Sequence, residues 1–83
     1  MDTLIVEIRL PAINRSDDYV LPAHIPVAAI LPSLAEVVRM NTGADVIDPE
    51  RPMLCFLHGK RPIPPDKTLS QAGVRDSAKL MLI

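Results

Sequence analysis

The sequence predicts an α+β fold, in which one amphipathic helix lies across one face of a mixed sheet of four to five strands. The first observation is the segment from Pro26 to Met40, whose large apolar residues recur at the spacing of one helical face. The second is that every other periodic segment is short and reads as a strand. A lone helix must bury its apolar stripe, and these strands are the only available partner. The stripe consists of Val27, Ile30, Leu31, Leu34, Val37, Val38 and Met40.

Two prolines and a glycine define the predicted helix. Pro26 suits the first turn, where its missing N–H has no partner in any case. Pro32 falls inside the helix, where a proline removes one backbone hydrogen bond at a cost of ~3 kcal/mol. Either a short first turn ends there and the main helix restarts, or one helix kinks. The stripe stays in phase across Pro32, which favours one kinked helix, ending with Asn41 or Gly43 as a left-handed cap.

Two strands are predicted before the helix. Residues 3–10 alternate, with Leu4, Val6, Ile8 and Leu10 on one face. Residues 11–17 form a loop of turn-forming residues, and residues 18–21 form a second short strand, which gives an N-terminal hairpin.

The segments after the helix complete the sheet. A polar linker (42–52) leads to residues 53–57, which are all apolar and predict a central strand. Residues 61–63 are predicted to form a brief edge strand, because their proline cannot serve a central one. Residues 68–73 suit a single helical turn, and residues 79–83 alternate as a last strand. If this last strand runs parallel beside the first, the arrangement is a β-grasp fold.

The composition limits the function classes. Eighty-three residues make a single domain, 1–83. The one cysteine, Cys55, rules out an internal disulfide, and no cofactor or metal-ligand cluster is evident. A net charge of −1 and only two aromatic residues argue against nucleic acid. No apolar run reaches the ~18 residues of a membrane span, and no signal peptide is evident, so we expect a cytoplasmic protein without direct membrane insertion.

The second half of the chain resembles ubiquitin-like domains. From Leu54 to Ile83 it carries a strand, a Gly59-Lys60 turn and a final Leu-x-Leu strand. Between the turn and that strand lie a Thr-Leu-Ser step at residues 68–70 and a turn closing on Gly73-Val74. In this order, over about thirty residues, the pattern is fairly specific.

The first half resembles a narrower group, the ubiquitin-like proteins of bacterial type VII (ESX/WXG100) secretion. These include small YukD-like proteins and the ubiquitin-like domain that opens the EccD-type membrane subunit. The matching residues are Leu21-Pro22, Pro26-Val27, Ile30-Leu31-Pro32 and Leu34. The resemblance implies a non-enzymatic accessory or regulatory module. It also implies protein partners in the secretion machinery, which would hold the module at the cytoplasmic face of the membrane.

Two alternatives remain open at this point. Ubiquitin-like modifiers and sulfur carriers are activated by an adenylating enzyme at a C-terminal Gly-Gly, which this sequence, ending at Ile83, does not carry. We therefore expect a chain that is not conjugated. The chain could also be the head of a larger membrane subunit.

No set of residues predicts catalysis. Cys55 lies mid-strand between apolar neighbours, as a buried structural thiol does. His24 and His58 lie in predicted loops and assemble no metal site. Asp17 and Asp18 are adjacent in sequence, so a strand would point them to opposite faces. Lys60 aligns with a ubiquitin lysine used for chain linkage, but a lysine in a turn needs no function.

The predicted interaction surface is the sheet face that points away from the helix. If Leu80 and Leu82 face the helix, then Met81 and Ile83 face outward, and alignment through Gly59-Lys60 places Leu54 and Phe56 beside them. An exposed apolar patch of this kind marks an interaction site, and a patch or an edge strand also offers a homodimer contact. The alternative is a shift of one residue, or a bulge, in the strand at 53–57, which would turn Phe56 into the core.

Overall fold

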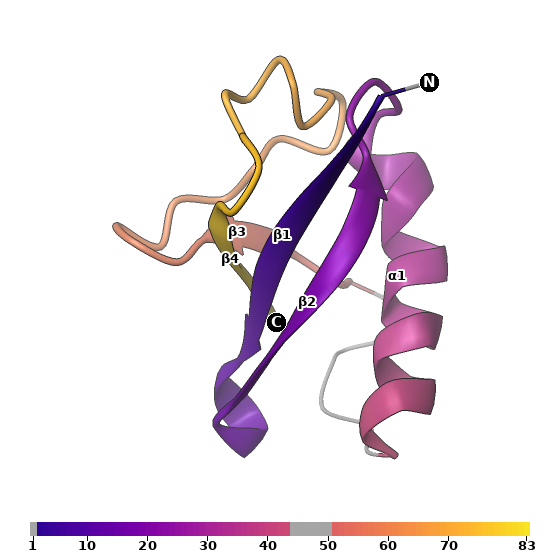
Figure 1. The fold of residues 1–83 in the computed structure, drawn as a ribbon, viewed down its shortest axis with the longest axis vertical. Helices are drawn as coiled ribbons and strands as arrows, with labels where there is room; N and C mark the ends of the chain where they lie inside the picture. The colour runs from indigo at the N-terminus through magenta and orange to yellow at the C-terminus, as the bar shows by residue number, and fades with distance from the viewer. Residues whose placement is uncertain (1, 44–50) are drawn as a thin grey trace.

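The computed structural model describes residues 2–43 and 51–83, which form one sheet with one helix across it (Figure 1). The sheet contains β1 (Thr3–Leu10), β2 (Arg15–Pro22), β3 (Leu54–Phe56) and β4 (Lys79–Leu82), in the order β2-β1-β4-β3. A 3-10 turn, η1 (Pro11–Ile13), joins β1 to β2, and the helix is α1 (Val27–Thr42). The predicted α+β fold with a mixed sheet is confirmed.

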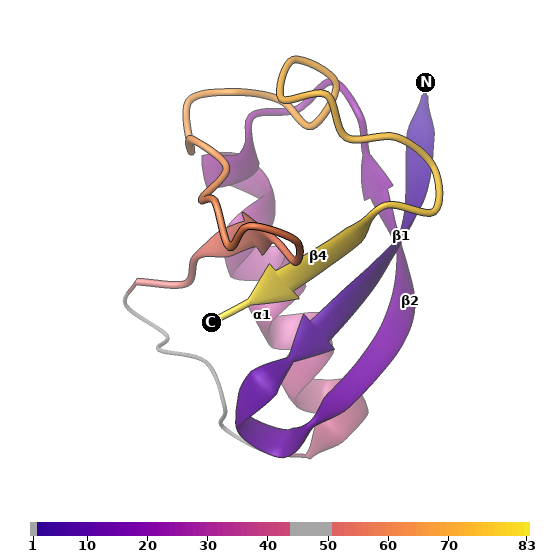
Figure 2. The same ribbon diagram turned by 90° about the vertical axis from the view of Figure 1, so that its left-hand side faces the viewer.

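The first and last strands form the centre of the sheet. β4 runs parallel to β1, with Ile8 opposite Leu80, whereas β2 and β3 pair antiparallel on either side. The Glu7 N–H donates to the Ala78 carbonyl at 2.9 Å, and the Ile5 N–H donates to Asp76 Oδ1 at 2.9 Å. In Figure 2, β4 lies beside β1 and the two arrows point in the same direction. This pairing is the β-grasp arrangement that the sequence predicted.

Helix α1 is a single element that continues through Pro32. It begins directly after Pro26 and ends at Gly43, which has a φ of 70° and donates its N–H to the Arg39 carbonyl at 2.8 Å. Gly43 is therefore the predicted left-handed cap. Pro32 lies on the exposed side of the helix, where water can bind the carbonyl that proline leaves without a partner.

The core lies between α1 and the inner face of the sheet. Val6, Ile8 and Leu10 of β1 pack there with Leu80 and Leu82 of β4. The helix contributes Val27, Ile30, Leu31, Leu34 and Val38. The predicted stripe was too wide, because Val37 is 50% exposed and Met40 is 76% exposed. Val37 lies in the groove beside β2, the last strand on that side, and not against the inner face of the sheet.

β2 is longer than predicted, because pairing starts at Arg15 instead of Asp18. Asn14 adopts a left-handed conformation with a φ of 52°, which lets Arg15 pair directly with Leu10. The early part of the strand has few apolar residues, so its alternation was not visible in the sequence. In place of apolar contacts, this part of the strand has an ion pair between Arg15 Nε and Asp17 Oδ2 at 2.7 Å.

β3 lies at the end of the strand order, so the prediction of a central strand was wrong. Its free edge is covered by the backbone of residues 61–63, with Phe56 N–H donating to the Arg61 carbonyl and Ile63 N–H to the Leu54 carbonyl, both at 2.9 Å. This covering segment forms a single bridge, Cys55 to Pro62, in place of the predicted strand. A buried edge of this kind reads in sequence like a central strand, because both need continuous apolar residues.

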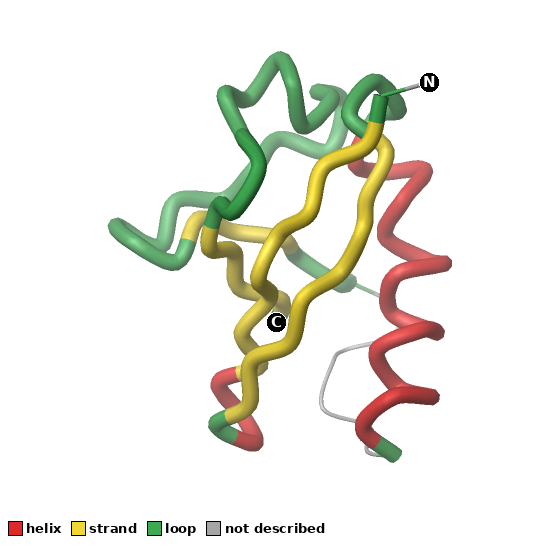
Figure 3. The backbone as a smooth tube through the Cα atoms, viewed as in Figure 1, coloured by secondary structure: helices red, strands yellow, loops and turns green. Residues whose placement is uncertain are grey.

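The path from β3 to β4 is irregular but hydrogen-bonded (Figure 3). Thr68 and Gln71 form a capping box, in which each backbone N–H donates to the other side chain at 3.0 Å. The Ala72 N–H also donates to the Thr68 carbonyl at 3.0 Å, which is the predicted single helical turn. The predicted linker 42–52 lies mostly outside the described residues.

Candidate protein-interaction surfaces

Two of the four predicted interface residues belong to the core side of the sheet. Leu54 pairs with Leu82 and is 1% exposed, and Phe56 pairs with Leu80 and packs partly buried against the core. Their expected outward placement is therefore wrong. The strand has the one-residue shift that was the alternative interpretation. Consecutive apolar residues at 53–57 could not specify which face is buried.

The other two residues, Met81 and Ile83, lie on the outer face. Met81 pairs with Cys55, and Ile83 exchanges two backbone hydrogen bonds with Met53, at 2.8 and 3.0 Å. These four residues form a block that we call the outer patch. Met53 and Ile83 are each 44% exposed, whereas Met81 is 7% exposed and Cys55 is buried. Met53 was not among the predicted interface residues. In the observed register it lies on the outer face, opposite Ile83.

Basic side chains accompany the outer patch. Arg9 of β1 lies opposite Met81, and Lys79 precedes Met81 by two residues on the same face of β4. Arg61 is not part of this set, because its guanidinium lies 5.2 Å from the centre of the ring of Phe56, which is on the core side of the sheet. Apolar residues beside basic ones fit a partner surface that combines apolar and acidic groups.

Cys55 behaves as the structural thiol that was expected. It is buried, and this burial raises the pKa of the Cys55 thiol above its ordinary value. A raised pKa keeps the sulfur protonated at neutral pH, and the thiol is a poor nucleophile in that form.

The remaining candidate residues lie apart from one another. His24 is exposed and lies 3.1 Å from an Asp2 carboxylate oxygen, while His58 and Lys60 are exposed in the turn after β3. Asp17 and Asp18 point to opposite faces of β2. Within residues 2–43 and 51–83, no three His, Cys, Asp or Glu side chains lie together as a metal site would require.

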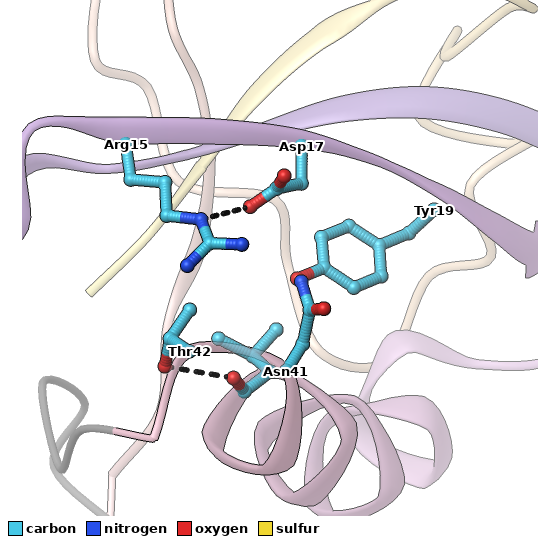
Figure 4. A network of polar contacts seen from close by, with 6 residues as sticks. Arg15, Asp17, Tyr19, Asn41 and Thr42 are labelled. Atoms are coloured by element: carbon cyan, nitrogen blue, oxygen red, sulfur yellow. Dashed lines mark hydrogen bonds and ion pairs between the residues drawn. The ribbon is translucent and has the colours of Figure 1, made fainter.

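A second apolar surface lies between β2 and α1. We call it the edge groove; it has a volume of about 310 Å³. Its strand side is Tyr19 to Pro22, and its helix side includes Ala29, Ser33 and Val37. At the C-terminal end of the helix, Asn41 Nδ2 donates to Tyr19 Oη at 3.1 Å, beside the Arg15–Asp17 pair (Figure 4). The groove was not predicted from the sequence, although the apolar helix stripe, which is wider than the sheet can cover, was a signal of it.

Comparison with known proteins identifies the family. A family model described as "WXG100 protein secretion system (Wss), protein YukD" matches residues 4–82. The chain belongs to the YukD family. This agrees with the resemblance that the Leu-Pro and Val-x-x-Ile-Leu-Pro positions of the first half indicated.

The YukD-family chain is also similar to parts of larger secretion proteins. It is 38% identical over 65 residues to the ESX-4 secretion system protein eccD4 of Mycobacterium tuberculosis, a match that covers 78% of this chain. The chain spans only 14% of the length of that relative. Its activity and partners therefore do not transfer directly.

Solved structures agree with this assignment. The ubiquitin-like domain of the Mycobacterium tuberculosis type VII secretion system protein ECCD1 has a TM-score of 0.78 and 30% identity, covering 100% of this chain and 99% of that one. A chain of protomer 1 of the ESX-3 core complex has a TM-score of 0.76 and 27% identity, covering 99% of this chain and 16% of that one. The fold of the YukD-family chain is thus ubiquitin-like. Its described residues contain no helix long and apolar enough to cross a membrane.

Proposed function

We propose that this YukD-family chain is a non-enzymatic accessory module of a type VII secretion machinery, which binds other machinery subunits at the cytoplasmic face of the membrane. The observation that carries this proposal is the family match over residues 4–82. The similarity to a chain of the ESX-3 core complex supports it, because there a domain of the same fold is one part of a much larger subunit.

The outer patch is the surface that we assign to this binding. Met53 and Ile83 lie side by side and are exposed, and directly opposite residues on antiparallel strands have their side chains in contact range. The buried pair Cys55 and Met81 supports them as a rigid apolar floor. Of the residues first expected in this role, Met81 and Ile83 are kept, while Met53 replaces Leu54 and Phe56.

The chemistry of the described residues supports binding over catalysis. The one thiol, Cys55, is buried and protonated at neutral pH, and the two histidines, His24 and His58, are exposed. We therefore infer that the chain acts by presenting a surface. We further propose that it is not conjugated to other proteins. A homodimer would use the same outer patch, since an exposed apolar pair can form a two-fold contact.

The test is co-purification of the tagged chain with the membrane core complex of a type VII secretion system from the same organism. Met53→Asp and Ile83→Asp place a charge on the outer patch without changing the core. We expect each variant to reduce the amount of co-purified complex at least tenfold, as for an apolar residue that is buried in an interface. Ile13→Asp is the matched control, because Ile13 is similarly exposed but lies in η1, outside both the outer patch and the edge groove.

Two results would contradict the proposal. Unchanged co-purification of Met53→Asp and Ile83→Asp would remove the outer patch as the binding surface. Formation of an ATP-dependent thioester or thiocarboxylate with a cognate adenylating enzyme would instead show that the chain is a modifier or sulfur carrier. Circular dichroism of each variant establishes that the fold is intact.

A further inference from the structure

The backbone of β2 has an unused side. The Glu7 N–H donates to the Ala78 carbonyl and the Ile5 carbonyl accepts from Ser77, so the odd-numbered residues of β1 direct their backbone groups toward β4. The even-numbered residues of β1 therefore face β2. Their partners in β2 are odd-numbered, because the register pairs Val6 with Tyr19 and Leu4 with Leu21.

It follows that Ser16, Asp18 and Val20 direct their N–H and C=O groups away from the sheet. β2 is the first strand in the order, and within the described residues no backbone group bonds to this edge. The opposite edge differs, because the backbone of residues 61–63 covers β3. One open edge of eight residues therefore remains, paired without interruption on its other side.

Apolar side chains lie directly beside this open edge. Val37, on the helix side of the edge groove, is 50% exposed, and Val20, on the strand itself, is 64% exposed. Ile25, just before α1, also lines the groove and is 38% exposed. This side of the molecule therefore combines unpaired backbone groups with exposed apolar side chains. Soluble proteins rarely leave either of these features uncovered.

We propose that the edge groove binds an extended peptide segment of a partner protein, which adds to β2 as a fifth strand. Such a strand would pair its backbone with Ser16, Asp18 and Val20, and would direct alternate apolar side chains against Val37. A helix could cover Val37, but it would leave the backbone edge without partners. An extended segment pairs with the backbone edge and covers the apolar side chains at the same time.

The charge of the edge determines the polar side of the segment. Asp17 is paired with Arg15 on the inner face, whereas Asp18 points to the outer face. Its neighbour in β1 is another acid, Glu7, which has Lys79 of β4 on its other side. Asp18 is therefore the acid next to the open edge, and a lysine or arginine on the outer side of the added strand lies opposite it. The peptide has apolar residues on its inner side and basic residues on its outer side.

The same charge disfavours a second copy of this chain. A two-fold pairing of β2 with β2 that uses all three outward-facing residues places Ser16 opposite Val20 and Asp18 opposite Asp18. Like charges directly opposite each other destabilise a strand pair, and charged residues on edge strands are a common device against self-pairing. The occupant is therefore a different sequence.

The test is an NMR titration of the 83-residue chain with a defined peptide, acetyl-Thr-Val-Lys-Val-Arg-Val-Thr-amide. We expect the largest amide shifts at Ser16, Asp18 and Val20, with shifts at Val37. A matched peptide with glutamate in place of lysine and arginine should bind about threefold more weakly. Asp18→Lys should reverse that preference, which a purely structural role for Asp18 would not do.

Two variants separate strand addition from general apolar binding. Val20→Pro removes one outward N–H, which an edge strand tolerates, and should weaken the peptide about tenfold, whereas Val20→Thr keeps the N–H and should bind normally. Val37→Asp should abolish binding. Met53→Asp, on the outer patch, should not change it, so this inference and the proposed function can fail independently.

Four results would overturn the inference. The first is a lack of saturable shifts at millimolar peptide, and the second is shifts centred on Met53 and Ile83. The third is normal binding by Val20→Pro. The fourth is a dimer in sedimentation equilibrium that Val37→Asp dissociates, because a second copy would then be the occupant.

Discussion

Leu54→Ala removes three buried carbon atoms from the inner face of β3, where the side chain is 1% exposed and belongs to the core around Leu82. At about 0.8 kcal/mol for each buried carbon group, the lost transfer free energy is about 2.4 kcal/mol. The cavity left behind adds to this, and measured Leu→Ala costs in cores run to about 2–5 kcal/mol. We therefore expect the free energy of unfolding to fall by about 3 kcal/mol.

This loss is large for a chain of this size. At about 0.05–0.15 kcal/mol per residue, an 83-residue domain has a total stability of roughly 4–12 kcal/mol. Each kcal/mol lowers Tm by about 4–8 °C in a domain of this length, so Leu54→Ala should melt more than about 10 °C below wild type. Urea denaturation followed by circular dichroism measures the difference directly, with the slope against urea unchanged.

Met53→Ala is the matched control, because Met53 precedes Leu54 on the other face of the sheet and is 44% exposed. We expect it to cost less than about 1 kcal/mol. If Leu54→Ala and Met53→Ala cost the same, or if Met53→Ala cost more, the register of β3 against β4 would be shifted by one residue. The outer patch as assigned would then be wrong.

Three further predictions concern single interactions. Gly43→Ala forces a Cβ into the left-handed cap of α1, where φ is 70°, and should lower the free energy of unfolding by about 1 kcal/mol in urea melts. Thr68→Ala deletes the side-chain half of the capping box with Gln71 and should cost about 0.5–2 kcal/mol by the same assay, whereas Thr68→Ser should cost little. Burial raises the pKa of Cys55 above its ordinary value of 9.0, so above that pH the unfolded chain binds fewer protons than the folded one. The free energy of unfolding should therefore be at its full value below pH 9 and fall as the pH rises past it, and Cys55→Ala should remove this slope; an equal slope in both proteins would show that another group is responsible.

The sequence predicted the elements whose pattern has a single solution. Alternation in residues 3–10 predicted which face of β1 is buried, because one face carries only leucine, isoleucine or valine. In residues 79–83 both faces are apolar, and the resemblance to ubiquitin-like domains indicated that Leu80 and Leu82 face the helix. Helical spacing predicted α1, and Asn41 or Gly43 was expected as its cap, because few other residues adopt a left-handed conformation without strain. Of the two, Gly43 is the cap in the structure.

The parts that could not be predicted are those where the local apolar and polar pattern does not distinguish one face from the other. Residues 53–57 are all apolar, so only their pairing with β4 decides that Leu54 faces the core and Met53 faces solvent. The start of β2 is polar on both faces and is held by the register with β1 and by the Arg15–Asp17 pair. Val37 fits the helical stripe, and its exposure depends on where the sheet ends, which is a property of the assembled fold.

The contact between β1 and β4 has a consequence for how the molecule is made. The hydrogen bond from the Ile5 N–H to Asp76 joins residues 71 positions apart, and it lies next to the parallel pairing at the middle of the sheet. During synthesis the hairpin of β1 and β2 can leave the ribosome early, but β4, the other neighbour of β1, is translated after the helix and the other three strands. Contacts of such long sequence separation slow folding, because the chain must close a large loop before it gains their free energy. Until β4 is translated, α1 is the main element that can cover the apolar face of the nascent hairpin.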